Sequence, residues 1–508
     1  MVLVNLANAK FISHRIDPAS ADIDDLISLY RQALDLRPPG RPDRPATLLQ
    51  LAQALLFRYE RQRCNKSIAD IKESSVADEI ELLMAEVNEI CHEDTFEFRA
   101  ASLVLQTLKR YRVLARAVLV ELGELVSELE RSVEMPPLWH FDRPYRMINL
   151  SAALCKLFEL TGDLGNLGKS ISVTEEAARF ISDGHFDKPW VLFSLGDALY
   201  VRFTRGGNIT DLDRSISMLE GALKFIPDGH PARPWMATKL GTAHLVRFVF
   251  GNVSGLKTLF FVTTSAGHFP KVRSSQLNSL PWPTGTGTLT TSNPTDLEQA
   301  ISRHREVAGI LVDGNPHKPG CLTNLASSLL VRFWCLGNRS DLEEAISMHR
   351  DAIILSPDDH HLNNLALSLR ARFEHFGNLS DLEEAISKHK AAVALLPDGP
   401  NCLNYLGHYI MARFEHIGNA SNNEESISDL VVALKLIPDI RLDKPSHLNN
   451  LTFSLGASFQ CVDETSDREE ATLKTLRTLS NSRLMATLTD RLFDQPLPRS
   501  SSAFQVLS

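Results

Sequence analysis

The sequence predicts an all-α solenoid, built from antiparallel pairs of helices that follow one another along the chain. Two observations support this fold class. The segment GNRSDLEEAISMHRDAIILSPD, which begins at Gly337, returns as GNLSDLEEAISKHKAAVALLPD from Gly377. A second shared segment, LNNLALSLRARFEHFGN, separates these copies and carries helical hydrophobic spacing. Internal repeats of this length predict stacked units that touch only their neighbours.

The first helix of each unit is predicted from an apolar stripe. Leu362, Leu365, Leu369 and Phe373 follow helical steps, so they share one face, and that face must be buried. An Arg-Phe pair in this helix marks the repeat, and successive arginines lie 45, 85, 40 and 41 residues apart. These arginines are Arg202, Arg247, Arg332, Arg372 and Arg413.

The second helix is predicted between a turn and a proline. Gly377 tolerates the positive φ at which the first helix ends. Ser380 and Glu383 have the spacing of a capping box, which predicts Ser380 as the cap residue. Small residues such as Ala385 let the two helices approach closely, and Pro397 ends the second helix because proline cannot continue it.

The repeat signals divide the chain into two arrays and three other segments. Residues 253–294 are rich in Pro, Gly, Ser and Thr and have no helical period, which predicts an irregular segment. Because the 85-residue interval equals one 45-residue and one 40-residue repeat, we interpret this segment as replacing a repeat. The predicted order is an N-terminal tail (1–21), repeats (22–252), the irregular segment (253–294), repeats (295–485) and a C-terminal tail (486–508).

Three origins of the irregular segment stay open. It is a coding lesion such as a frameshifted or wrongly spliced exon, a genuine binding loop, or the product of simple divergence. In each case we expect the helix pairs on its two sides to lose a packing neighbour. Such a loss matters because repeat arrays are stabilised mainly by nearest-neighbour contacts.

Composition and missing motifs narrow the function. The net charge of -9 comes without a basic cluster, so a nucleic-acid partner is not expected. The 7 cysteines are scattered without metal-site spacing, which favours a reducing compartment and no bound metal. The chain has no signal-peptide pattern and no apolar run of about 20 residues, so we expect a cytoplasmic or nuclear protein without a membrane partner. Catalytic and nucleotide-binding motifs are missing, which predicts a non-enzyme without cofactors.

The repeat resembles the tetratricopeptide repeat. That signature has a Leu-Gly pair on the first helix, and the second helix carries alanines seven residues apart with a proline 12 residues after the first alanine. The Leu-Gly pairs are Leu195-Gly196, Leu240-Gly241, Leu406-Gly407 and Leu455-Gly456. The resemblance covers roughly residues 22–480 and implies a right-handed superhelix. The units of 40 to 45 residues are longer than the usual repeat.

The longer units resemble the repeat arrays of mushroom-forming fungi that often precede a CHAT domain, which is caspase-like. The resemblance implies a protein–protein interaction scaffold that binds a peptide or a partner domain on its concave surface. The alternative is the sensor arm of a CHAT-type signalling protein whose catalytic domain is absent from this chain. Too few residues follow the last unit for such a domain, so no protease activity is expected. The repeat pattern does not indicate whether the chain is a monomer or an oligomer.

Repeated polar residues are the candidate partner-binding groups. The five arginines of the Arg-Phe pairs form a ladder that can bind acidic groups, or they pair with the DLEE carboxylates of a neighbouring turn or unit. Asparagines just before the Leu-Gly position can grip a peptide backbone, or they are solvated amides. The recurrent histidines His304, His349 and His389 suggest a metal site or pH switch, or packing between helices. The asparagines are Asn324, Asn364, Asn404 and Asn450.

Overall fold

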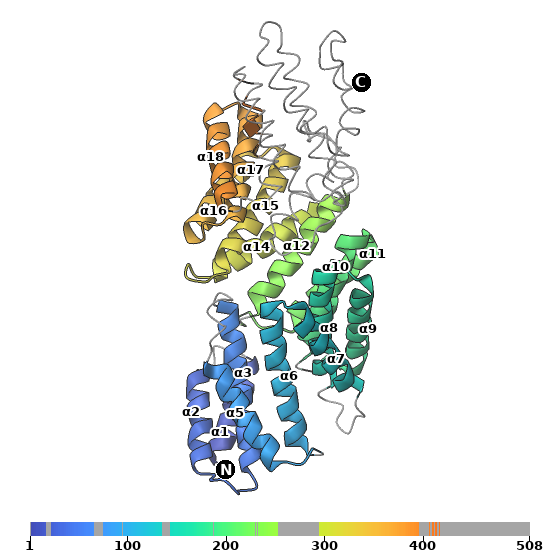
Figure 1. The fold of residues 1–508 in the computed structure, drawn as a ribbon. Coiled ribbons are helices and arrows are strands. Elements are labelled where there is room, and N and C mark those ends of the chain that lie inside the picture. Colours follow the sequence, from blue (N-terminus) through green and yellow to red (C-terminus); the bar gives the residue numbers. More distant parts are fainter. Residues whose placement is uncertain are drawn as a thin grey trace, which may run out of the picture. The chain divides into compact units, whose positions relative to one another are not determined.

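The computed structural model describes residues 2–16, 22–65, 75–134, 143–251 and 294–395, with single-residue gaps at 94, 186, 229 and 231. Between 400 and 420 it describes only Leu406, Tyr409, Ile410, Ala412, Arg413 and His416. Every regular element in this part of the chain is an α-helix (Figure 1). The helices are α1 (Val2–Ile16), α2 (Ile23–Asp35), α3 (Arg44–Asn65), α5 (Ser75–Ile90), α6 (Phe96–Arg116), α7 (Leu119–Glu134), α8 (Arg143–Thr161), α9 (Leu164–Phe180), α10 (Lys188–Gly206), α11 (Ile209–Lys224), α12 (Arg233–Gly251), α14 (Pro294–Ile310), α15 (Lys318–Leu336), α16 (Arg339–Leu355), α17 (Asp359–Phe376) and α18 (Leu379–Leu395).

The predicted fold class is confirmed: the chain is an all-α repeat protein. It divides into two compact units. The first holds Met1–Arg247 and Pro294–Cys321, and the second holds Phe248–Asn293 and Leu322–Ser508. Within each unit, consecutive helices pack in pairs, such as α8 on α9, α10 on α11 and α17 on α18.

Each pair is an antiparallel hairpin. In α10 and α11, Arg202 contacts Asp211 near the turn, and Ser215 Oγ donates a 2.6 Å hydrogen bond to the carbonyl oxygen of Gly196 farther from it. The first contact lies near the turn in both helices, and the second lies farther from the turn in both helices. This order of contacts is expected of an antiparallel pair. The turn itself uses Gly207 at φ +70°, as glycine at this position predicts.

The cap of the second helix differs from the prediction. Asn338 caps α16 and accepts a hydrogen bond from the Ser340 backbone N–H, and Asn378 accepts one from Ser380 in the same way. The prediction of Ser380 as the cap is therefore wrong, because α18 begins at Leu379. Asparagine is among the strongest N-cap residues, so the helix starts two residues earlier than the capping box indicates.

Small residues hold the paired helices close together. A side chain added at Gly196 would place its Cβ 2.9 Å from Cγ of Leu219 on the partner helix. At Gly241 the added Cβ would lie 2.7 Å from Nε2 of His304. Ala385 is fully buried in its pair. The predicted close approach at these positions is confirmed.

The N-terminal helices share one hydrophobic cluster that runs from α1 to α6. Ala7 of α1, Tyr30 of α2 and Leu55 of α3 are all fully buried in it. The Tyr30 hydroxyl also donates a 2.7 Å hydrogen bond to Asn8 Oδ1. The residues assigned from sequence to an N-terminal tail therefore include a packed helix.

Helices α12 and α14 form one pair although the chain between them is long. Arg247 contacts Asp296 with the same atoms that join Arg202 to Asp211, and His304 of α14 lies against Gly241 of α12. The expectation that the helix pairs on the two sides of the segment lose a packing neighbour is wrong for α12 and α14, because these two helices pack on each other.

The Arg-to-Asp separation is 49 residues in this pair and 9 in the α10–α11 pair, so 40 extra residues stand between its two helices. That is the length of one repeat. This arrangement would result if irregular sequence had replaced the second helix of one unit and the first helix of the next unit. That residues 253–294 replace a repeat stays a prediction, since nearly all of them lie outside the described residues.

Removing residues 253–292 is expected to preserve the array. The deletion joins Asn252 to Asn293 and restores the separation of 9 residues found in the α10–α11 pair. Because a shorter connection costs less closure entropy, the free energy of unfolding in urea should stay equal or rise by about 1–3 kcal/mol. The matched control removes residues 209–248, which hold a described second helix and most of a first helix, and should destabilise the protein. A cooperative transition lost in the first variant would contradict the assignment of α12 and α14 as one pair.

Candidate interaction site

The repeated arginines make the most regular polar contacts in the structure. In four described pairs, Nε and Nη2 of the arginine donate to the two carboxylate oxygens of an aspartate in the first turn of the second helix, at 2.5–2.9 Å. The aspartate side chains are only 2–5% exposed. We call this contact the Arg–Asp fork. The forks are Arg202–Asp211, Arg247–Asp296, Arg332–Asp341 and Arg372–Asp381.

A third N–H of the same guanidinium reaches the preceding pair. Arg372 Nη1 donates to Glu343 at 2.7 Å, and Glu343 lies in the second helix of that pair. Arg247 Nη1 donates to Asp213 at 3.1 Å in the same way, and Arg413 contacts Glu383 at 3.3 Å. One arginine therefore ties its own second helix to the second helix before it.

In the Arg247–Asp296 fork the contacts shift the ionisation of both partners toward the charged forms. The hydrogen bond to Asp296 raises the pKa of Arg247 above its ordinary value. Burial alone would raise the pKa of Asp296, but hydrogen bonds from Arg247 and His244 outweigh it, so that pKa is lowered. This fork therefore stays ionised at neutral pH.

The arginine side chains thus form ion pairs with the carboxylates of the DLEE-type segments. This is the internal pairing that the sequence analysis gave as the alternative to an external acidic ligand. Partner binding through the five arginines stays a prediction. The exposed fraction of the side chain falls from 38% at Arg202 to 16% at Arg413.

The predicted asparagines differ in their surroundings. Asn324 is half-buried in α15. Asn364 is 3% exposed, and its side-chain nitrogen lies 3.3 Å from Nε2 of His360. Asn404 and Asn450 lie outside the described residues. A role of these amides in gripping a peptide backbone stays a prediction.

The recurrent histidines pack between helices. His304, His349 and His389 are at most 1% exposed. His349 Nδ1 lies 3.0 Å from Ser368 Oγ, and His389 Nδ1 lies 2.7 Å from Asn363 Oδ1. The packing interpretation is confirmed. Burial lowers the pKa of His304 to about 4 and that of His349 and His389 to about 3.

A row of aromatic residues is a further surface feature that the sequence interpretation missed. Tyr145, Trp190 and Trp235 each occupy the third residue of a first helix, directly after an Arg-Pro or Lys-Pro pair, at intervals of 45 residues. Tyr145 and Trp190 are half-buried, and Trp235 is 47% exposed. The Trp235 ring lies 3.9 Å from that of Phe193 on the neighbouring first helix. The recurrence of Pro-aromatic at the repeat interval was the signal that could have found this row.

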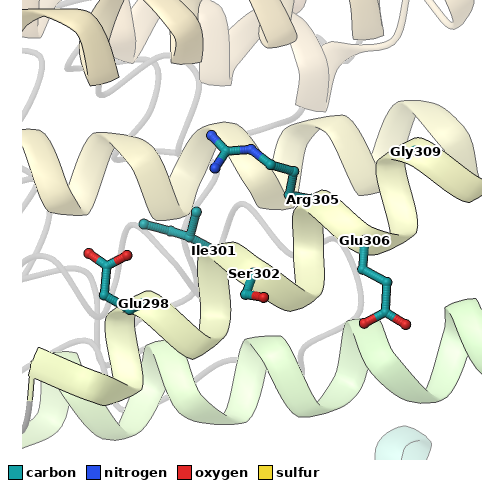
Figure 2. A pocket seen from close by; sticks show the side chains of 6 residues that line it. All are labelled: Glu298, Ile301, Ser302, Arg305, Glu306 and Gly309. Carbon is teal, nitrogen blue, oxygen red and sulfur yellow. The ribbon is translucent and has the colours of Figure 1, made fainter.

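A shallow hollow of about 420 Å³ lies along α14 (Figure 2). Its described lining comes from this helix alone: Glu298, Ile301, Ser302, Arg305, Glu306 and Gly309. Figure 2 shows Ile301 and Arg305 on one side of the helix and Glu306 on the other. Side chains that diverge in this way do not converge on a ligand, as those of small-molecule sites do.

The described part of the chain holds neither a metal-binding cluster nor a membrane-spanning helix. Among these residues, no cluster of three or more His, Cys, Asp or Glu side chains has the arrangement of a metal site. None of the described helices combines the length and the apolar character needed to cross a bilayer.

Comparison with known proteins places one repeat in a family. The model of the tetratricopeptide repeat matches residues 360–400, which hold nearly all of α17 and the whole of α18. This helix pair is therefore similar to a tetratricopeptide repeat. The comparison with curated proteins found no significant match.

Solved helical structures share low similarity with the chain. The APC/C hetero-tetramer Cut9–Hcn1 contains a chain that is 11% identical, with a TM-score of 0.43; the match covers 84% of this chain and 59% of that one. Human IFIT1, solved as a dimer with PPP-AAAA, is 12% identical with a TM-score of 0.38, and the match covers 87% and 84%. This chain thus spans less than two thirds of the Cut9–Hcn1 chain that it matches.

Acidification is expected to destabilise the folded protein through its packed histidines His304, His349 and His389. Their folded pKa values of about 3–4 lie below the ordinary 6.5, so the unfolded chain binds more protons between these values. Stability is therefore complete above pH 6.5 and falls as pH decreases, by about 1.4 kcal/mol per pH unit for each histidine. Urea unfolding between about pH 7 and pH 5 measures this slope. His349→Met should reduce it, whereas substitution of the exposed His92 by Met should leave it unchanged; equal slopes in both variants would contradict the assignment.

Proposed function

We propose that this chain is a protein-interaction scaffold that binds a peptide segment of a partner on the surface formed by its first helices. A tetratricopeptide repeat in an all-α repeat array supports the scaffold class. The first helices α8, α10 and α12 follow one another in the chain, and each leaves the aromatic residue at its third position at least partly exposed. A surface of this kind offers an extended chain the same contacts at regular intervals.

The polar contacts on this surface support the proposal. Lys239 Nζ of α12 lies 2.9 Å from Asp197 of α10, with exposed fractions of 24% and 30%. Trp190, Ser194 and Asp197 stand at helical steps on one face of α10. Charged, hydroxyl and aromatic groups therefore lie together on neighbouring first helices, which is the composition of a peptide-binding surface.

We further infer that the chain acts in the cytoplasm or nucleus without catalysis, and that nucleic acid and membranes are not its partners. The net charge of -9 supports the exclusion of nucleic acid. The regular ion pairs of the forks support a structural rather than a catalytic use of the repeated carboxylates. The alternative of a CHAT-type sensor arm stays a prediction from resemblance.

Peptide display against the full-length chain tests the proposal. We expect a random peptide library to yield enriched ligands whose binding falls at least about tenfold in Ser194→Arg, since a long cation on the first-helix face blocks the surface. Ser217→Arg is the matched control, because Ser217 is exposed on the second helix α11. A library without enriched ligands, or ligands that bind both variants equally, would refute the proposed surface.

A further inference from the structure

We propose that the aromatic row of the first compact unit binds a basic, proline-rich segment in the polyproline II conformation; this deepens the proposed function and rests on it. We call Tyr145, Trp190 and Trp235 the aromatic strip. Its members come from α8, α10 and α12, and all three lie in the first compact unit.

The three helices that carry the strip are direct neighbours. Helix α8 packs on α10. Helix α10 is joined to α12 by the 2.9 Å contact between Asp197 and Lys239 and by the tilted rings of Phe193 and Trp235, whose centroids lie 3.9 Å apart. Packed helices lie about 8–10 Å apart, so the strip offers one ring from each first helix at about this interval.

The interval matches the period of one backbone conformation. A polyproline II helix has three residues per turn and rises about 3.1 Å per residue, so it presents the same face about every 9 Å. A proline at every third position therefore meets one ring of the strip after another. Extended β-strands repeat the same face about every 7 Å and fall out of step with helices spaced this way.

The chemistry of the rings suits the same ligand. Domains that recognise polyproline II segments use aromatic-lined grooves, because flat rings pack on the pyrrolidine ring and the ligand loses little entropy on binding. Trp235 leaves 47% of its surface exposed even though it contacts Phe193. A large exposed aromatic side chain at a repeated position is typical of a binding surface.

Exposed carboxylates beside the strip determine the charge of the ligand. Asp183 and Asp228 lie in the loops that precede α10 and α12, with side chains 88% and 97% exposed. Each contacts the basic residue at the start of its helix, Lys188 or Arg233, at 3.0–3.2 Å. The outer face of each carboxylate remains in solvent and accepts a second cation. Lysine or arginine next to the prolines complements this edge.

Labelled peptides and full-length protein test the inference by fluorescence anisotropy. The probe KPAAPAAPAAPK has a proline at every third position, and KPPPPAAAAAAK has the same composition without that period. We expect the periodic peptide to bind more tightly, and Trp235→Leu to weaken it by about tenfold. The control Trp334→Leu replaces a half-buried tryptophan outside the strip and should leave binding unchanged. Circular dichroism of each variant confirms that the helices persist.

The outcomes separate this inference from the proposed function. Equal binding of both peptides, no binding of either, or the same loss in Trp334→Leu and Trp235→Leu would overturn the inference. If peptide display returns ligands without the proline period that still depend on Ser194, the scaffold function stands and the polyproline ligand is wrong. Asp228→Asn should weaken binding of the lysine-containing peptide but not of a version with serine in place of lysine. Equal effects on the two peptides would show that the Asp228 carboxylate does not contact the ligand's cation.

Discussion

The Arg–Asp fork is the contact on which the arrangement of four helix pairs depends, from α10–α11 to α17–α18. Its two parallel, charge-assisted hydrogen bonds fix both the distance and the orientation of the first turn of the second helix. The aspartates are 2–5% exposed, so each would be an uncompensated buried charge without its arginine. The apolar stripes drive the helices together, and the fork specifies how they meet.

The same guanidinium also couples successive pairs. Arg372 contacts Asp381 in its own pair and Glu343 in the preceding one. Repeat arrays gain stability from the sum of such nearest-neighbour contacts. The α12–α14 pair follows the same rule, because Arg247 finds Asp296 across a long connection and also contacts Asp213 of the preceding pair. The same local contacts therefore form between α12 and α14 although the connection between these helices is much longer than in the other pairs.

Much of the fold was predictable from sequence because the signals are local. The apolar spacing, the glycine at φ +69° at Gly377 and the small residues at the helix contacts all act within one hairpin. The cap was misplaced because two polar residues two positions apart, Asn378 and Ser380, are both able to cap the helix. The pairing of α12 with α14 could not be read from the sequence, since 49 residues separate the two members of its fork.

The candidate site was less predictable than the fold. Sequence spacing identified the arginines but did not decide between an external ligand and Asp341 or Asp381, because that choice depends on how deeply the carboxylate is buried. The position of Asn364 before the Leu-Gly position suggested a surface amide, whereas the side chain is 3% exposed. Tyr145, Trp190 and Trp235 lie outside the strongest repeat copies, so the interpretation missed them although each follows a proline at the 45-residue interval.

A double-mutant cycle on Arg372 and Asp381 tests the central role of the fork most directly. Arg372→Leu, Asp381→Leu and the double variant are compared by urea unfolding of the full chain. Each single change should cost about 3 kcal/mol, and the coupling energy should exceed about 2 kcal/mol. The exposed pair Arg350–Glu384, at 2.9 Å, provides the reference and should couple by less than about 0.5 kcal/mol. A coupling energy for Arg372 and Asp381 as small as that of the exposed pair would contradict the account.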